Sequence, residues 1–442
     1  MKATRSEMNR RAMLLTAAGA LTAPALAACG ATPGAAKPAA ASGELVFMDW
    51  GDIANTPTEV VVKNFQEKFP NIKLQVDPTP ADYETKMRAL VAAGTPDDIH
   101  RINDDYVRSY AAGKLLTDLF PYIRRDKLKR EDFFPTVYDF PIFENKYWAW
   151  GVGNNPRLFF VNLTLFNNMG VKPPVFDTWD PPGWTWEDMI DAAKKLTKDF
   201  GTDSAQFGVS IYDDTGFEET FLQTFGVADG IYSKETNPQR WTMASPEGIG
   251  ALQQVIDLTC VHRVQRPYDY RQSSSTLFQQ GKLGMQFNTV GYANTLARNV
   301  KDFDWDIAPV PKKAKRVTEG SLIVYCVPKD AQHPDAAWQL LNYMGGEEAG
   351  QVFAEQRAFI PTRVAAAQTY FKAKPGEKPA HLNVAVEANK VAVNVHYAEG
   401  TERARQIYRP AFAKTAYVCQ ESLKTTVESV RTAIDGALNG KV

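Results

Sequence analysis

Strand-like and helix-like patterns alternate along the start of this chain, and this alternation restricts the fold more than any other feature of the sequence. The segment ELVFMDW is a continuous apolar run, which is typical of a strand buried on both faces. An amphipathic helix follows, in which Val61, Phe65 and Phe69 recur every four residues. The alternating strand IKLQV, a helix that ends at Gly94 and the strand-like DDIHRIND come next. This order predicts an α/β fold with a parallel sheet.

The same alternation returns in the middle of the chain, and its extent bears on the number of lobes. The strand-like RLFFVNLTLF is followed by the helical pattern TWEDMIDAAKKLTKD and the strand-like QFGVSIY. Later segments lead to a helical tail over about 401–438. Because 442 residues exceed what one compact core accommodates, we expect two lobes of about 200 residues each.

The first 28 residues are typical of a signal peptide. Basic residues precede an apolar run over 12–23, which is shorter than the about 20 residues that span a bilayer. The run leads to LAAC, which resembles the bacterial lipobox, so we expect Cys29 to be lipidated; an ordinary signal peptide with an incidental cysteine is the alternative. The Arg10–Arg11 pair leaves twin-arginine and general secretion both open. Residues 29–43 predict a flexible linker.

Charge and cysteine content limit the partners and the covalent links. A net charge of −1 without a basic block gives no reason to expect nucleic acid or direct membrane binding as a function of the folded part. Beyond the leader, Cys260, Cys326 and Cys419 each lie in an apolar stretch. We therefore expect buried thiols rather than a disulfide, although one bridge remains possible in an oxidising compartment.

Sequence signatures of catalysis and metal binding are missing. The five histidines are scattered, and neither His-Glu-x-x-His, Gly-x-Ser-x-Gly nor a phosphate-binding glycine loop occurs. We expect no enzyme activity, no metal site and no cofactor. One enzymatic alternative remains, a lipid-anchored glycoside hydrolase that uses Asp52 and Asp105 as its two carboxylates.

Seven segments in a fixed order carry a family resemblance that extends over nearly the whole chain after the leader. They are FQEKFPNIKLQV, YETKMRALVAAGTPDDI, AAGKLLTDL, LFFVNLTLFNNMGVKPPVFDTW with TWEDMIDAAKKLT, LFQQGKLGMQF, DIAPVPK and HPDAAWQLLNYM. Together they resemble the solute-binding proteins of ABC importers, specifically the sugar-binding branch (family 1) that includes maltose-binding protein.

This resemblance implies a two-lobed periplasmic-binding-protein fold with hinge strands between the lobes. It places the crossings near 153–160, near 288–291 and near 345–348. The expected first lobe is therefore 44–153 plus 291–345, and the expected second lobe is 154–290 plus 346–442. Proteins of this kind close around a ligand held between the lobes.

Candidate ligand residues follow the strand-like segments, because ligands of open α/β sheets bind outside the carboxyl ends of the strands. Aromatic rings can cover the C–H faces of a sugar, while carboxylates bond its hydroxyl groups. We expect ligand contacts from Trp50, Asp52, Asp104, Asp105, Asp213 and Phe217. The alternative for Trp50 is that it ends its strand inside the core.

The resemblance adds further positions to this set. The segment with Trp148, Trp150, Asn154 and Asn155 matches one that lines the cleft in the family, although about half of its aromatic residues are expected in the core. The remaining positions are Asn288, Tyr292, Ser321 and Arg363. Tyr292 stands where the family often has Gly-x-Trp, and Ser321 follows a Glu-Gly pair where Gly-Gly is common. Arg363 alternatively forms an ion pair at the surface or between lobes.

These observations predict a lipid-anchored, monomeric protein on the outer face of a cell membrane. It would capture a mono- or oligosaccharide and deliver it to the transmembrane permease subunits of an ABC importer. A binding protein for a solute other than sugar is the remaining alternative.

Overall fold

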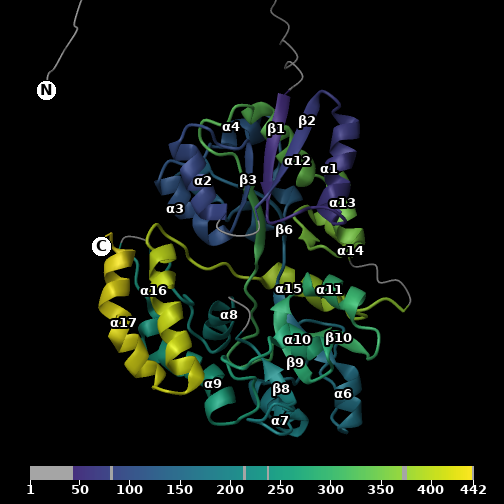
Figure 1. The fold of residues 1–442 in the computed structure, drawn as a ribbon, viewed down its shortest axis with the longest axis vertical. Coiled ribbons are helices and arrows are strands. Elements are labelled where there is room, and N and C mark those ends of the chain that lie inside the picture. Colours follow the sequence, from purple (N-terminus) through teal and green to yellow (C-terminus); the bar gives the residue numbers. More distant parts are fainter. Residues whose placement is uncertain (1–42, 80–82, 213–215, 236–237, 371–375, 441–442) are drawn as a thin grey trace, which may run out of the picture. The chain divides into compact units, whose positions relative to one another are not determined.

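The computed structural model describes residues 43–79, 83–212, 216–235, 238–370 and 376–440. The signal peptide expected over 1–28, Cys29 and the linker up to residue 42 lie outside the described residues, as does Asp213. Gly43, expected at the end of the linker, is already part of the first strand. Among the described residues, the strands form one six-stranded, one four-stranded and one two-stranded sheet. The two larger sheets define two α/β lobes (Figure 1), which confirms the predicted fold class.

The first lobe contains the larger sheet, in the order β12-β6-β11-β3-β1-β2. Strand β1 pairs in parallel with β2 and β3, while β11 is antiparallel to β3 and β6. The strands are β1 (Gly43–Asp49), β2 (Ile72–Pro78), β3 (Ile99–Ile102), β6 (Trp150–Asn154), β11 (Leu322–Cys326) and β12 (Ile360–Pro361). The helices are α1 (Pro57–Lys68), α2 (Tyr83–Ala92), α3 (Val107–Ala112), α4 (Phe120–Arg125), α5 (Pro135–Tyr138), α12 (Pro334–Met344), α13 (Glu347–Glu355) and α14 (Val364–Tyr370).

Local sequence explains the start of this lobe. The Thr56 hydroxyl accepts a hydrogen bond from the Glu59 amide, and Pro57 occupies the first turn of α1. The predicted apolar stripe of α1 packs inward, with Val61 and Phe65 fully buried. Helix α1 thus begins and packs as its sequence predicts.

The second lobe contains the smaller sheet, in the order β10-β7-β9-β8. Its strands are β7 (Arg157–Asn162), β8 (Phe207–Ser210), β9 (Leu283–Thr289) and β10 (Trp305–Ala308). Its helices are α6 (Leu163–Asn168), α7 (Trp186–Leu196), α8 (Phe217–Thr224), α9 (Pro246–Cys260), α10 (Ser274–Gln279), α11 (Tyr292–Asn299), α15 (Asn383–Val391), α16 (Thr401–Lys414) and α17 (Leu423–Leu438).

Short elements complete the described chain. Strands β4 (Ile142–Phe143) and β5 (Lys146–Tyr147) form the two-stranded sheet. The 3₁₀ turns are η1 (Asp104–Tyr106), η2 (Arg130–Asp132), η3 (Thr242–Ala244) and η4 (Ala416–Val418). None of the helices in the described ranges has the length and apolar character needed to cross a membrane.

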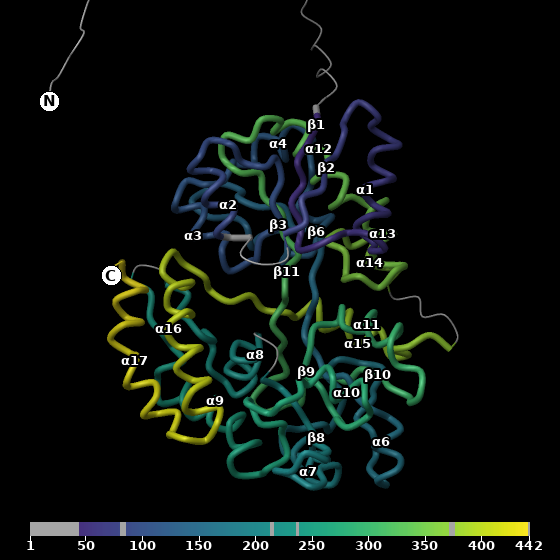
Figure 2. The backbone as a smooth tube through the Cα atoms, viewed as in Figure 1, coloured from purple at the N-terminus to yellow at the C-terminus, as the bar shows by residue number. Residues whose placement is uncertain are grey.

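Strand pairing shows where the chain passes between the two sheets. The chain leaves the first sheet at the end of β6 and enters the second sheet in β7, where β6 and β11 lie side by side (Figure 2). However, β10 pairs with β7, so the chain returns to the first sheet only after Ala308 rather than near 288–291. Strand β12 pairs with β6, so the last crossing follows α14 rather than 345–348. A short apolar strand fits either sheet, and its local pattern does not identify its partner.

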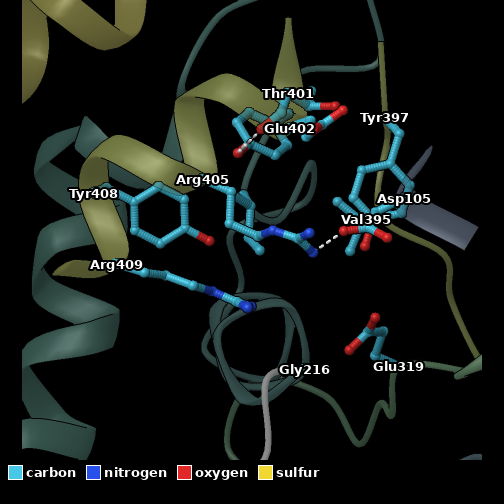
Figure 3. A pocket seen from close by; sticks show the side chains of 12 residues that line it. Asp105, Gly216, Glu319, Val395, Tyr397, Thr401, Glu402, Arg405, Tyr408 and Arg409 are labelled. Atoms are coloured by element: carbon cyan, nitrogen blue, oxygen red, sulfur yellow. Dashed lines mark hydrogen bonds and ion pairs between the residues drawn. The ribbon is translucent and has the colours of Figure 1, made fainter. Parts of the chain in front are cut away.

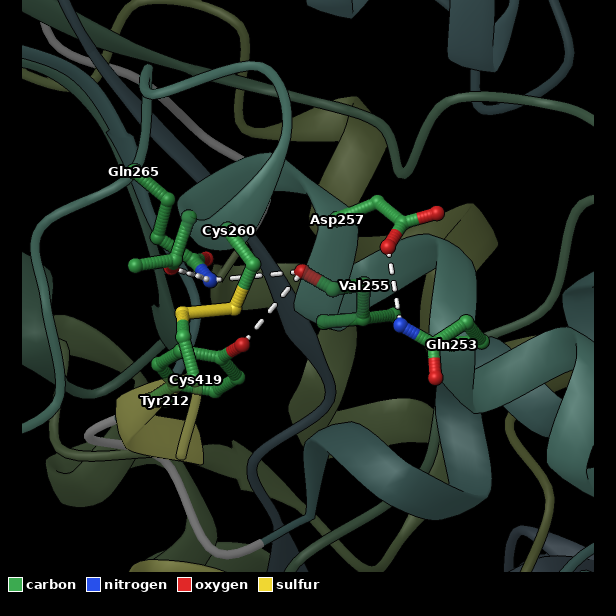
Figure 4. Close-up of a disulfide and its surroundings, with 8 residues drawn as sticks. Tyr212, Gln253, Val255, Asp257, Cys260, Gln265 and Cys419 are labelled. Carbon is green, nitrogen blue, oxygen red and sulfur yellow. Dashed lines mark hydrogen bonds between the residues drawn. A yellow bond between two sulfur atoms is a disulfide. The ribbon is translucent and has the colours of Figure 1, made fainter. Parts of the chain in front are cut away.

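A disulfide links Cys260 at the end of α9 to Cys419 after η4 (Figure 4), which contradicts the expectation of unpaired thiols. The two cysteines are 159 residues apart, so only the packing of α9 near η4 brings them together. The bridge ties the α16–α17 hairpin to the second lobe. Cys326 is a buried free cysteine, as expected.

Candidate functional site

A polar cavity lies where η1 of the first lobe meets α8 and α16 of the second lobe (Figure 3). The space between atoms amounts to about 320 Å³, part of it open to solvent, but only about 20 Å³ admits the centre of a water-sized sphere, which is room for about one water molecule. Its walls combine carboxylates, guanidinium groups and tyrosine rings from distant parts of the chain. The lining residues are Asp105, Gly216, Ile231, Tyr232, Glu319, Val395, Tyr397, Thr401, Glu402, Arg405, Tyr408 and Arg409.

The first lobe contributes acidic side chains through η1, which directly follows β3. Asp105 is buried and forms an ion pair with Arg405 of α16. Asp104 is the adjacent residue, and its Oδ2 accepts a hydrogen bond of 3.4 Å from the Leu322 amide at the start of β11. Burial raises the pKa of Asp104, although this hydrogen bond and Arg157 act in the opposite direction. Asp104 and Asp105 therefore lie just beyond the carboxyl end of β3, and their contact with a ligand stays a prediction.

A buried ion pair forms another wall of the cavity. Arg157 Nη1 lies 3.0 Å from Glu319 Oε2, and each side chain is only 6% exposed. The backbone amide of Glu319 donates to the hydroxyl of Thr220 in α8 at 3.0 Å. Gly216 precedes α8, and a Cβ atom there would collide with both Glu319 and Arg157. A larger residue at position 216 would therefore have to displace the side chains of this ion pair.

Helix α16 provides the wall opposite η1. Glu402, Arg405 and Arg409 are separated by three and four residues, a spacing that places them along one helix face. Figure 3 shows Arg405 directed toward Asp105, with Arg409 one turn further along. Burial raises the pKa of Tyr408 to about 12, so its hydroxyl stays protonated at neutral pH.

Sequence reasoning missed Glu319, Tyr397 and the residues of α16. The segment TERARQIYRP carried the one usable signal, because its charged residues recur at helical spacing. A charged helix face is normally solvent-exposed, so this pattern alone did not indicate a cavity wall.

The charges around the cavity are paired. Arg405 faces Asp105, Arg157 faces Glu319, and Arg409 Nη2 lies 3.6 Å from Glu218 Oε2. Such walls offer many hydrogen-bond donors and acceptors without a dominant net charge, which suits a neutral ligand with several hydroxyl groups. Among the described residues, no group of three or more His, Cys, Asp or Glu side chains could hold a metal ion.

Trp50 follows β1 and is 37% exposed, so it does not end the strand inside the core. The Arg101 guanidinium lies 4.0 Å from the centre of the Trp50 ring. Arg101 is held by Asp49, whose other carboxylate oxygen accepts a hydrogen bond from Tyr325 at 3.0 Å. Asp52 occupies an exposed turn, where its carboxylate accepts from the Ala54 amide at 2.9 Å. Neither Trp50 nor Asp52 lines the cavity of Figure 3.

Three other candidate aromatic residues are parts of the core. Trp150 is 1% exposed and packs against Trp338 with 5.0 Å between ring centres. Trp148 is buried, and its Nε1 donates to the Phe143 carbonyl at 3.0 Å. Phe217 is 2% exposed in the core of the second lobe. Large rings bury much apolar area, and these three lie in the core rather than at a ligand surface.

The candidate amide and hydroxyl residues near the first crossing lie between the lobes. Asn154 is fully buried and donates from Nδ2 to Asn389 Oδ1 at 2.7 Å. The backbones of Asn155 and Ser321 exchange two hydrogen bonds, of 2.9 and 3.2 Å. These residues hold β6 and β11 together where the two strands pass between the lobes.

Asn288 and Tyr292 lie on the second lobe and make local contacts. Asn288 Oδ1 accepts from the Thr289 amide at 2.8 Å, and the Tyr292 hydroxyl donates to the Ser275 carbonyl at 3.3 Å. Neither is among the residues that line the cavity.

Arg363 forms an ion pair inside the first lobe. Its Nη1 lies 3.5 Å from Asp132 Oδ2, and its guanidinium lies 4.6 Å from the centre of the Phe133 ring. Both partners belong to the first lobe and are partly exposed, so Arg363 forms a surface ion pair rather than one between the lobes. Of the described residues expected to bind ligand, Asp105 alone lines the cavity of Figure 3.

Comparison with known proteins places the whole architecture in context. Residues 50–351 match the family described as "Bacterial extracellular solute-binding protein". A binding protein of Brucella abortus (strain 2308) is 22% identical over 306 residues, which cover 69% of this chain and 72% of the relative.

Two solved structures have a similar fold at low sequence identity. An ABC substrate-binding protein from Listeria monocytogenes, in complex with cycloalternan, has a TM-score of 0.78 and 21% identity and covers 90% of this chain and 99% of its own. UgpB from Mycobacterium tuberculosis, in complex with glycerophosphocholine, has a TM-score of 0.74 and 15% identity and likewise covers 90% and 99%.

Proposed function

Because the chain belongs to the bacterial extracellular solute-binding protein family, we propose that it captures a mono- or oligosaccharide between its lobes for an ABC importer. The family consists of binding proteins rather than enzymes. The observation that carries the proposal is the polar cavity, whose walls come from both lobes. The Listeria protein of similar fold was solved with a saccharide, which supports this choice of ligand class.

The position of the cavity suggests how binding is linked to lobe closure. Asp105 belongs to the first lobe, whereas Tyr408 and Arg409 belong to the second. A ligand that bonds both sets gains its full contacts only when the lobes are closed, so it shifts the population toward that state. The permease subunits would then recognise the closed form.

The paired charges of the cavity walls favour contacts with a neutral sugar over contacts with a fully charged solute. At these walls a phosphodiester would require a cation without a carboxylate partner, whereas Arg405 and Arg409 both face acidic groups. The likeness to UgpB concerns the fold and does not decide the ligand.

The glycoside hydrolase alternative lacks its pair of carboxylates. Asp52 lies in an exposed turn, and Asp105 is engaged by Arg405. Acid and nucleophile roles require two carboxyl groups that flank one bond. We therefore retain the binding protein as the proposal.

The lipid anchor and the outer-face location rest on the leader sequence and on Cys29. Expression of Cys29→Ser should release the protein from the membrane fraction, while the wild type stays there. Retention of the variant would contradict the anchor and would leave the binding function unaffected.

A thermal-shift screen against neutral mono- and oligosaccharides tests the binding function. A ligand that binds only the native state raises the melting temperature, by an amount that grows with its concentration relative to Kd. We expect one group of related saccharides to do so without being hydrolysed. Turnover, or no shift with any saccharide, would overturn the proposal.

A further inference from the structure

A second hollow lies beside the cavity and is also bounded by both lobes. It has a volume of about 910 Å³, which includes space open to solvent. We call it the side groove; it is lined by Arg108 of α3, by Thr136 and Phe140 at α5, by Gln223 of α8 and by the segment 393–396. Val395 lines both hollows, so the side groove adjoins the cavity.

Arg108 is the most unusual group in the side groove. Its Nε is buried and has no hydrogen-bond partner among the described residues. No ion pair within the described ranges involves Arg108, and its guanidinium lies 5.1 Å from the centre of the Phe143 ring. Burial without a facing carboxylate lowers the pKa of Arg108. A desolvated guanidinium in this position is favourable only if an anion or water completes its hydrogen bonds.

The surrounding groups make the side groove cationic. Lys234 adds an exposed ammonium group at its edge. Both Lys234 and Arg108 act with burial to lower the pKa of His396, so these three groups lie within electrostatic reach of one another. Asp229 and Glu235 act on His396 in the opposite direction, but neither lines the groove, and Glu235 forms an ion pair with Arg240.

The carboxylate that lines the side groove does not neutralise these cations. Asp139 forms an ion pair with Arg130, with 2.6 Å between Nε and Oδ1. The half-buried side chain of Asn394 donates from Nδ2 to the Thr136 carbonyl at 2.8 Å. Uncompensated cations beside fixed amide groups are the pattern that recognises carboxylate and phosphate oxygens.

We propose that the side groove binds the anionic group, carboxylate or phosphate, of an acidic saccharide held between the two lobes. This inference rests on the proposed saccharide function and makes the substrate class more specific. The neutral walls of the cavity and the cationic side groove would then recognise different parts of one ligand.

Matched pairs of saccharides test this inference in the purified protein at constant ionic strength. The probes are glucose with glucuronate and glucose 6-phosphate, galactose with galacturonate, and inorganic phosphate alone. In at least one pair the acidic member should bind about tenfold or more tightly than its neutral partner, as expected for hydrogen bonds to a charged group. A uronate-only or phosphate-only preference identifies the source of the anion.

Variants locate the preference in the side groove. Arg108→Gln should remove the acidic preference and leave affinity for the neutral partner unchanged, whereas Arg108→Lys should keep part of it. Arg124→Gln, which removes an exposed positive charge from α4 of the same lobe, is the matched control and should change neither affinity. Each shift is measured against the ligand-free melting temperature of the same variant.

The outcomes separate this inference from the proposed function. If neutral and acidic partners bind equally, or if Arg108→Gln keeps the preference, the inference is overturned while saccharide binding stands. If neither neutral nor acidic saccharides bind, both proposals are overturned, even where inorganic phosphate alone raises the melting temperature.

Discussion

Arg405 of α16 forms an ion pair with Asp105 of η1, and this pair connects the two lobes. One turn earlier, Glu402 Oε2 lies 3.1 Å from Arg88 Nη2 and accepts from the Ser109 hydroxyl at 3.3 Å. The α16–α17 hairpin is fastened to the second lobe by a disulfide. Opening of the lobes must therefore separate these contacts, which favour the closed form together with the ligand.

The contacts of Glu402 with Arg88 and Ser109 predict that interactions between the lobes contribute a small part of the free energy of closure. Glu402→Gln should weaken saccharide binding by up to about fivefold, because an ion pair with one partner as exposed as Arg88 contributes about 0.2–1 kcal/mol. Isothermal titration with the best saccharide from the screen measures this. Glu428→Gln makes the same change in an exposed pair on α17 and should have no effect. Equal losses in the two variants would contradict a role of the Glu402 contacts in lobe closure.

Trp50 remains a proposed ligand contact outside the cavity. Its indole is partly exposed at the end of β1 and is fixed by Arg101, so it is available to a saccharide longer than one ring. Trp50→Ala should weaken binding of oligosaccharides by about 0.5–1.5 kcal/mol, as for other aromatic contacts. Trp50→Phe keeps an aromatic face and should lose less. Unchanged affinity in Trp50→Ala, with a preserved fold by circular dichroism, would remove Trp50 from the site.

The Cys260–Cys419 disulfide closes a long loop and should stabilise the second lobe. We expect reduction to lower the free energy of unfolding by about 2–4 kcal/mol, measured by urea denaturation with and without reductant. Cys260→Ser should be insensitive to reductant, whereas Cys326→Ala should respond as the wild type does. A wild-type protein that unfolds identically under both conditions would show that the bridge adds no stability.

Glu219 of α8 links stability to pH. Burial raises its pKa to about 7 from an ordinary 4.5, while its carboxylate accepts from Gln223 and from the Ile231 amide. Because the folded pKa is the higher one, its contribution is fully present below about pH 4.5 and is lost as pH rises through about 7. The loss is on the order of 3 kcal/mol.

Denaturation of Glu219→Gln at pH 5 and pH 8 measures this contribution. The variant should lose less stability between these pH values than the wild type does. Glu421→Gln, at an exposed position, is the control and should follow the wild type. Identical pH dependence in all three proteins would exclude Glu219 as the responsible group.

Sequence patterns predicted individual helices and strands better than they predicted which distant segments contact one another. Thr56 and Pro57 indicated the start of α1 because a capping hydroxyl and an N-terminal proline act locally. The sheet that receives β10 and the pairing of Cys260 with Cys419 depend on contacts between distant segments.

The candidate site shows the same difference between local and distant information. Asp105 was predicted because the end of β3 fixes it. Arg405 was missed because a charged helical pattern does not reveal which neighbouring element covers it. The sequence pattern around Trp150 indicated a ligand contact, yet Trp150 is the first residue of β6 and its side chain is buried in the core.

Small-angle X-ray scattering, with and without a saccharide that raises the melting temperature, tests the central claim most directly. We predict that the saccharide reduces the radius of gyration, because a ligand held between the lobes favours their closure. Identical scattering curves at saturating ligand would contradict a saccharide that closes the lobes.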